Sequence, residues 1–124
     1  MAWYAAHIIM YVRFKDGKQD KYPVWENIVL IEAGSDKEAW EKSKRRALRY
    51  EGDSRGSFTW EGRPATWVFA GIRKINTCVD PEQRPIDETE ITYSEFGLTT
   101  AEDLRKLVDG EPVEVVYVEQ PPRM

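Results

Sequence analysis

The sequence predicts an α+β fold: a mainly antiparallel sheet of five to six strands packed by one long helix, followed by a short C-terminal helix. Three observations support this prediction. Apolar side chains alternate from Trp3 to Phe14, a capped helical pattern covers residues 36–51, and glycine-containing turns separate further apolar runs. Residues 1–119 are expected to form a single domain, and residues 120–124 a flexible C-terminal tail.

The first two strands are predicted to form a hairpin. Every second residue of the first segment is apolar, which places one unbroken row on the core-facing side of a strand. The members of that row are Tyr4, Ala6, Ile8, Met10, Val12 and Phe14. Asp16 and Gly17 tolerate the backbone of a tight turn, so residues 24–33 are expected to return antiparallel to the first strand.

A helix is predicted from Asp36 to Glu51. Ser35 and Glu38 have the spacing of a capping box, in which each side chain accepts a hydrogen bond from a free backbone amide, and Gly52 is a natural stop. Residues at spacings of three and four form a stripe of modest width that packs on the sheet. The stripe consists of Ala39, Trp40, Ser43, Ala47 and Tyr50.

A second hairpin is predicted from residues 58–60 and 63–75, which flank a turn at Glu61 and Gly62. Gly71 lies inside the longer of these strands, where a glycine is typical of a β-bulge. The acidic, proline-containing stretch that follows at residues 80–90 is expected to be a solvated loop.

The C-terminal third is predicted to contain two more strands and one helix. Residues 91–96 and 113–118 have the apolar runs of short strands. Between them, Thr99 and Glu102 have capping-box spacing and open a helix that Gly110 ends.

The composition indicates a globular protein. Hydrophobic residues make up 41% of the 124 residues, and the net charge of −4 argues against bulk nucleic-acid binding, which needs a concentrated basic surface. Cys78 is the one cysteine, and an unpaired thiol is typical of a reducing compartment, so a cytoplasmic location is expected. Residues 5–12 are too few to span a bilayer, and neither a membrane segment nor an export signal is expected.

Short motifs are spread along residues 3–96: Trp3-Tyr4-Ala5, Val29-Leu30-Ile31-Glu32-Ala33 followed by Glu38-Ala39 and Glu41-Lys42, Trp60-Glu61-Gly62, Trp67 to Gly71-Ile72, and Glu90-Ile91-Thr92-Tyr93. Together they resemble a bacterial and phage family, domain of unknown function 4288. The motifs are structural, so the resemblance implies the fold and a cytoplasmic setting and supplies no activity. It leaves the second helix and the last strand as an addition.

The residue types argue against an enzyme. His7 is the only histidine and lies in mid-strand, while Cys78 lies at a strand end, so a nucleophile, a base and an acid are not expected to meet. The sequence has no phosphate-binding or dinucleotide-binding glycine loop. One His and one Cys are too few for a zinc site, and the acidic residues of 80–90 lack the spacing of a calcium loop. No catalytic residue, metal or cofactor is predicted.

A run of five cations lies on the first helix. A period of 3.6 residues places four of them on one side, beside the buried stripe, and turns Lys44 away. The four are Lys42, Arg45, Arg46 and Arg49. Guanidinium groups bind phosphate bidentately, so this row is a candidate anion cradle. The alternative is a solvated face, because Glu38 with Lys42 and Glu41 with Arg45 form favourable i,i+4 pairs.

The helix-free face of the sheet is the other candidate surface. Alternation directs a second row of side chains to this face, and the same rule applied to the strand at 63–75 extends that row. The row consists of Trp3, His7, Ile9, Tyr11 and Arg13, with Trp67, Phe69 and Arg73 from the later strand. A bulge at Gly71 would turn Arg73 over. Two simpler explanations account for the aromatic side chains on this face: a homodimer that packs sheet to sheet, or coverage by the second helix.

We expect a non-catalytic binding protein that captures a small anionic, nucleotide-like ligand at an oligomer interface, in the manner of phage sponge proteins that sequester cyclic-nucleotide or ADP-ribose immune signals. The expected stacking residues are Trp3, Tyr11, Trp67 and Phe69, and the expected phosphate contacts are Arg13, Arg45, Arg49 and Arg73. The alternative is an acidic interaction module, such as an immunity or inhibitor protein, that covers a basic partner. Neither a membrane nor bulk nucleic acid is expected as a partner.

Overall fold

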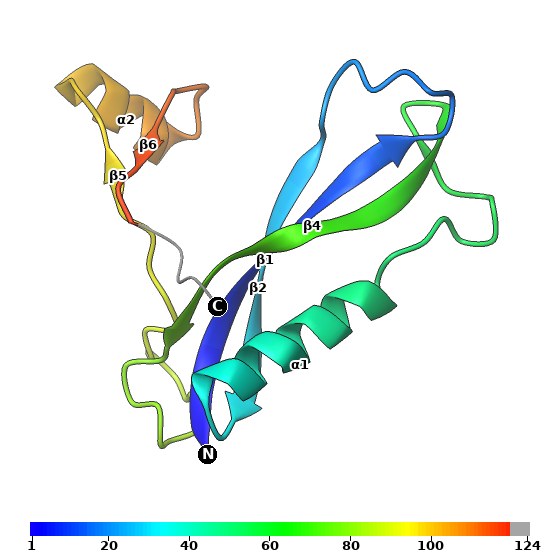
Figure 1. The fold of residues 1–124 in the computed structure, drawn as a ribbon. Coiled ribbons are helices and arrows are strands. Elements are labelled where there is room, and N and C mark those ends of the chain that lie inside the picture. Colours follow the sequence, from blue (N-terminus) through cyan, green and yellow to red (C-terminus); the bar gives the residue numbers. More distant parts are fainter. Residues whose placement is uncertain (120–124) are drawn as a thin grey trace.

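The computed structural model describes residues 1–119, which form a four-stranded antiparallel sheet, a two-stranded sheet and two helices (Figure 1). The larger sheet consists of β1 (Ala2–Phe14), β2 (Val24–Ala33), β3 (Thr59–Trp60) and β4 (Arg63–Thr77), in the order β2-β1-β4-β3. The smaller sheet pairs β5 (Phe96–Gly97) with β6 (Val116–Tyr117). The helices are α1 (Asp36–Arg49) and α2 (Ala101–Asp109). The tail expected at 120–124 lies outside the described residues.

The larger sheet has four strands instead of the five or six expected. The strands predicted at 91–96 and 113–118 are reduced to β5 and β6, which pair only with each other. The segment before β5 contacts the larger sheet through polar groups, because the hydroxyl of Thr92 bonds to His7 and the carbonyl of Tyr93 accepts from Lys74. This segment therefore lies across the face of the sheet and does not extend its edge.

Strand β1 is the centre of the larger sheet, because it pairs with β2 along one edge and with β4 along the other. The predicted core row of β1 is confirmed, since all six of its side chains are buried. Helix α1 lies along this face (Figure 1) and buries Ala39, Ser43 and Ala47 against it. The stripe is narrower than predicted, because Trp40 is half-buried and Tyr50 is 58% exposed.

Both helices begin at a hydroxyl cap. The Ser35 side chain accepts from the backbone N–H of Glu38, as predicted, while the Glu38 carboxylate accepts from the N–H of Gly34. Helix α2 is capped by Thr100, one residue later than expected, and ends at Gly110 in the left-handed conformation with φ 75°. These local signals are sufficient to place both helices to within two residues.

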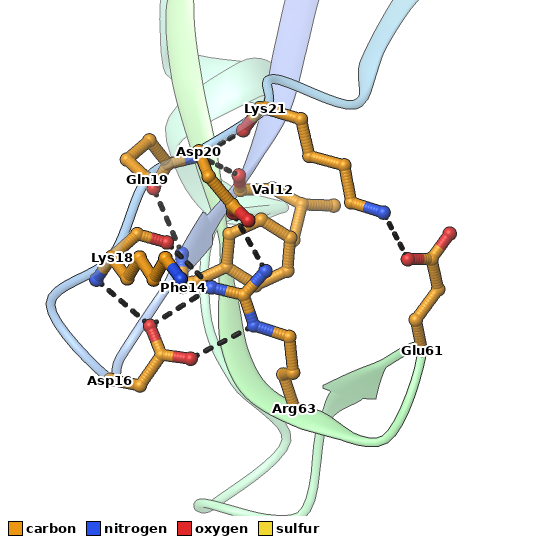
Figure 2. A network of polar contacts seen from close by, with 9 residues as sticks. All are labelled: Val12, Phe14, Asp16, Lys18, Gln19, Asp20, Lys21, Glu61 and Arg63. Carbon is orange, nitrogen blue, oxygen red and sulfur yellow. Dashed lines mark hydrogen bonds and ion pairs between the residues drawn. The ribbon is translucent and has the colours of Figure 1, made fainter.

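A polar network orders the long connection between β1 and β2 (Figure 2). Arg63, at the start of β4, donates to both carboxylate oxygens of Asp16 and to Asp20, and its guanidinium lies 3.6 Å from the centre of the Phe14 ring. These hydrogen bonds hold the pKa values of both aspartates below their ordinary values. The amide of Gln19 accepts from the backbone N–H of Phe14. The two hairpins are thereby joined at one end of the sheet.

The face of the larger sheet that α1 does not cover, here called the open face, is closed at one end only. Ala5, His7 and Lys74 are buried there beneath the segment that follows β4. Lys74 donates to the carbonyl of Tyr93 and, at 2.6 Å, to the carboxylate of Glu119. The ion pair attaches residues 96–119, here called the C-terminal unit, to the sheet; Figure 1 shows this unit standing away from α1.

We expect the attachment of the C-terminal unit to weaken in acid. Lys74 holds the pKa of the Glu119 carboxyl below its ordinary value of about 4.3. The stabilisation is therefore complete above that pH and is lost as pH falls through the lower folded-state pKa. Urea unfolding of the wild type and of Glu119→Gln should show a difference in stability at neutral pH that disappears in acid. Glu114→Gln, at an exposed position of the same unit, is the control, and a Glu119→Gln effect that is independent of pH would contradict the assignment.

Candidate functional site

The predicted positions of Trp67 and Phe69 on the open face are wrong. They pair with Val12 and Met10 of β1 and pack against the core beneath α1. The register of β4 against β1 shifts twice, at Ala70 and at Arg73, on either side of the predicted bulge position Gly71, which itself pairs with Ile9. Alternation does not continue across such irregularities, so Trp67 and Phe69 do not share a face with Arg73.

The other six residues of the predicted row lie on the open face: Trp3, His7, Ile9, Tyr11, Arg13 and Arg73. Tyr11 contacts Tyr22, with ring centroids 5.7 Å apart, and Arg13 is exposed. The Arg73 guanidinium lies over the ring of Tyr117, 3.5 Å from its centroid. Arg73 and Tyr117 border a shallow groove of about 550 Å³, whose other lining residues include Ile9, Val24 and Glu26. Trp3 is half-buried at the start of β1. Helix α2 does not cover this face, because none of its residues is buried.

A second groove lies between α1 and the edge strand β2. Its volume is about 400 Å³. The floor of the groove is formed by the apolar part of its lining, which includes Ile8, Met10, Ala47 and Trp67. Residues 26–29 of β2 form one wall. Arg46 of α1 and Tyr50, which follows it, form the other wall. Trp67 is therefore brought to a groove, although it is a different one from the groove that the sequence predicts.

The predicted row of cations flanks this second groove. Lys42 donates from Nζ to the backbone carbonyl of Glu32 at 2.7 Å, and the Arg46 guanidinium lies 4.4 Å from the centroid of Tyr50. Arg45 and Arg49 are exposed on the same side of α1. Lys42 and Arg46 therefore lie along the border between α1 and β2, and Arg45 and Arg49 lie farther from the groove lining.

The alternative explanation of this row, a solvated helix face, agrees with the exposure of Lys44, Arg45 and Arg49, but the i,i+4 salt bridges that it expects are not formed in the described part of the chain. Within residues 1–119 none of the five cations of α1 forms an ion pair. Glu38 is turned toward the backbone of Gly34. Arg46 and Arg49 lie in the last turn, where the helix dipole stabilises positive charge without an acidic partner. Arg45 and Arg49 are therefore exposed without a carboxylate partner in the described part of the chain, while Lys42 donates to the Glu32 carbonyl and Arg46 lies over Tyr50.

Sequence reasoning placed Lys42 and Arg46 in the candidate cation row but named only Arg45 and Arg49 of that row as phosphate contacts. Lys42 and Arg46 each precede a buried residue of α1, Ser43 or Ala47. On a helix that position lies beside the buried stripe and nearest to the sheet, so the signal was present in the sequence. Tyr50 was assigned to the core because its spacing fits the stripe.

Three polar residues meet at the closed end of the open face. Nδ1 of His7 donates to the Glu26 carboxylate at 2.6 Å, and Nε2 shares a hydrogen bond with the Thr92 hydroxyl at 2.7 Å. A catalytic triad has the same connectivity. However, His7 has no exposed surface, and neither groove is lined by His7 or Thr92. The network therefore fastens the segment after β4 to the sheet.

Replacing His7 should destabilise the fold. His7→Leu has a similar volume but leaves the Glu26 carboxylate and the Thr92 hydroxyl without their partner, which costs about 2–4 kcal/mol. Thr92→Val, which removes only the hydroxyl, should cost about 1 kcal/mol. Urea unfolding monitored by tryptophan fluorescence measures both values. A His7→Leu protein with wild-type stability would show that the network contributes nothing.

Metal and thiol chemistry find little support in the described part of the chain. Residues 1–119 contain no group of three or more His, Cys, Asp or Glu side chains that could hold a metal ion. Cys78 is buried, and burial raises the pKa of its thiol, which disfavours the reactive thiolate. None of the helices described is long and apolar enough to cross a membrane.

Comparison with known proteins gives one match. The model of a family described as a domain of unknown function (DUF4288) matches residues 3–93. No curated protein and no solved structure matches the chain. The matched residues include the larger sheet and α1, so both walls of the α1–β2 groove lie within them. The C-terminal unit lies outside the match.

Proposed function

The chain belongs to the family domain of unknown function 4288, which supplies no activity, and from the geometry we propose a non-catalytic binding protein that holds an anionic ligand in the α1–β2 groove. One observation carries the proposal: cations that have no acidic partner within residues 1–119 border a groove lined by both polar and apolar side chains. The protein as a whole has a net charge of −4, so this row of cations is a positively charged patch on an acidic protein. Such a surface attracts anions and gives their apolar part a floor to contact.

The chemistry of the groove fits a ligand that combines negative charge with a flat or apolar group. Arg46 and Lys42 offer N–H donors to phosphate or carboxylate oxygens. Tyr50 and Trp67 offer aromatic surface. A nucleotide-like molecule meets these requirements, and it would use only Trp67, Arg45 and Arg49 of the eight residues that the sequence predicts. The other five lie elsewhere.

The lining of the groove supports binding rather than catalysis. None of its residues is a serine, cysteine or histidine, so the groove lacks the usual nucleophiles and the usual base. Glu26 is the only carboxylate in the lining, and its oxygens are engaged by His7 and Tyr117. A bound ligand would therefore meet donors and apolar surface, with no group placed to attack it.

Neutralising the cations nearest the groove should weaken anion binding. We expect Arg46→Gln to raise the Kd about tenfold or more, because a charge-assisted hydrogen bond contributes about 1.5–3 kcal/mol. Adding Lys42→Gln should weaken binding further. Lys44→Gln makes the same change of charge on the far side of α1 and is the matched control. Native mass spectrometry and calorimetry with ATP, cyclic dinucleotides, tripolyphosphate and acidic peptides provide the measurement. The proposal fails if none of these anions binds, or if Lys44→Gln weakens binding as much as Arg46→Gln.

A second candidate is the acidic interaction module, and one observation favours it. The loop at residues 80–90 carries five carboxylates, none of which forms an ion pair within residues 1–119. They are Asp80, Glu82, Asp87, Glu88 and Glu90. Such a loop steers a basic protein partner toward this end of the molecule.

This second candidate makes the reverse mutational prediction. Neutralising Asp87, Glu88 and Glu90 together should slow association with a basic partner about tenfold at low salt, because exposed charges steer the encounter. Reversing Arg45 and Arg49 to glutamate should leave that association rate unchanged. Stopped-flow measurements on a partner isolated by affinity capture check both statements. A rate that follows the α1 variants and ignores the loop would remove this candidate.

A further inference from the structure

We propose that the anion held in the α1–β2 groove is an extended acidic peptide that adds to the free edge of β2 as an antiparallel strand. This inference rests on the proposed function and names its ligand. The cations explain why the ligand is acidic. The backbone of β2 explains why it is extended.

The direction of the β2 backbone groups follows from those of β1. The N–H and carbonyl of Trp3 bond to Pro81 and Cys78, at 2.7 and 2.9 Å, on the side away from β2. Trp3 and its partner Glu32 are therefore a non-hydrogen-bonded pair. In agreement, the Glu32 carbonyl points out of the sheet, where Lys42 donates to it.

Every second residue of β2 directs its backbone N–H and carbonyl groups out of the sheet, as Glu32 does. The register between β1 and β2 is unbroken, so the alternation that begins at Glu32 continues along the strand. The residues that direct N–H and carbonyl groups out of the edge are Val24, Glu26, Ile28 and Leu30, together with Glu32. Within residues 1–119 only the Glu32 carbonyl of this set has a hydrogen-bond partner beyond the edge.

This edge lacks the usual protection against strand addition. Natural edge strands are commonly blocked by lysine, proline, a bulge or a covering segment. Residues 24–31 contain no lysine or proline, and their register has no bulge. Lys42 blocks only the end of the strand. An added strand therefore finds a row of free donors and acceptors.

The side chains on the two faces of the β2 edge differ, and this difference predicts the sequence pattern of the peptide. On the open face, Val24, Ile28 and Leu30 are 54%, 51% and 39% exposed, which favours apolar residues at alternate peptide positions. On the helix side, Arg46 and Lys42 border the groove, which favours acidic residues at the intervening positions. The matching ligand is a segment in which apolar and acidic residues alternate.

A second copy of the chain fits this edge less well. Antiparallel pairing of two β2 strands about a two-fold axis would place both α1 helices on the same side of the joined sheet. The cation rows of the two copies would then face each other across the junction, and like charges repel. An acidic peptide places the opposite charge in that position.

The test uses the wild-type protein and a fluorescein-labelled peptide of eight alternating valine and glutamate residues. In the proposed geometry the valines pair with β2 through their backbone, while the glutamate N–H groups point away. N-methylation of the valines should therefore reduce binding, measured by fluorescence anisotropy, about tenfold or more, because several backbone hydrogen bonds are lost. N-methylation of the glutamates is the matched control and should be tolerated.

A variant of the protein tests the same edge. Ile28→Pro removes an outward N–H without breaking the ladder to β1, so it should abolish peptide binding while retaining the circular dichroism spectrum. If this variant does not fold, the N-methylated peptides still decide the question on the wild type.

The outcomes separate the inference from the proposed function. Binding that responds to Arg46→Gln but not to N-methylation or Ile28→Pro overturns strand addition and leaves anion binding standing. Binding that ignores Arg46→Gln overturns both. A wild-type dimer that Ile28→Pro dissociates, together with no peptide binding, assigns the edge to a second copy and overturns the peptide.

Discussion

The two-sided pairing of β1 is the constraint on which the rest of the molecule depends. One row of its backbone groups bonds to β2 and the other to β4, so β1 is satisfied on both edges and β2 becomes the outer strand. The small residues Ala39, Ser43 and Ala47 let α1 pack closely over the same strand. The groove arises because a closely packed helix lies beside an edge strand that has no further neighbour.

The open face and the helix side have separate roles. His7 and Lys74 close one end of the open face by bonding to the segment after β4 and to Glu119. That closure attaches the C-terminal unit, whose helix exposes Leu104 and Val108 and buries none of its residues. The C-terminal unit contacts the lining of the α1–β2 groove through the hydrogen bond from the Tyr117 hydroxyl to Glu26. Both walls of the groove lie within the matched residues, so we expect those residues to form it without that unit.

Sequence reasoning succeeded where the deciding interactions are local. The alternation of β1, the cap at Ser35 and the stop at Gly110 depend on neighbouring residues, and the structure places all three as predicted. It failed at Trp67, because two register shifts against β1 decide the face of β4. The strand predicted at 91–96 failed for a related reason: polar contacts from distant strands hold that segment, and no periodicity records them.

The proposed binding of an anion at the cation row would also be linked to folding. Lys42, Arg45 and Arg49 lie one or two turns apart on one side of α1 without acidic partners in the described part of the chain, and like charges at such spacings destabilise a helix. An anion in the groove removes this repulsion only in the folded state. Ligand at 100 times its Kd would therefore stabilise the protein by about 2.7 kcal/mol. In the proposed complex, the arrangement that is unfavourable in the free protein would thus become a source of affinity.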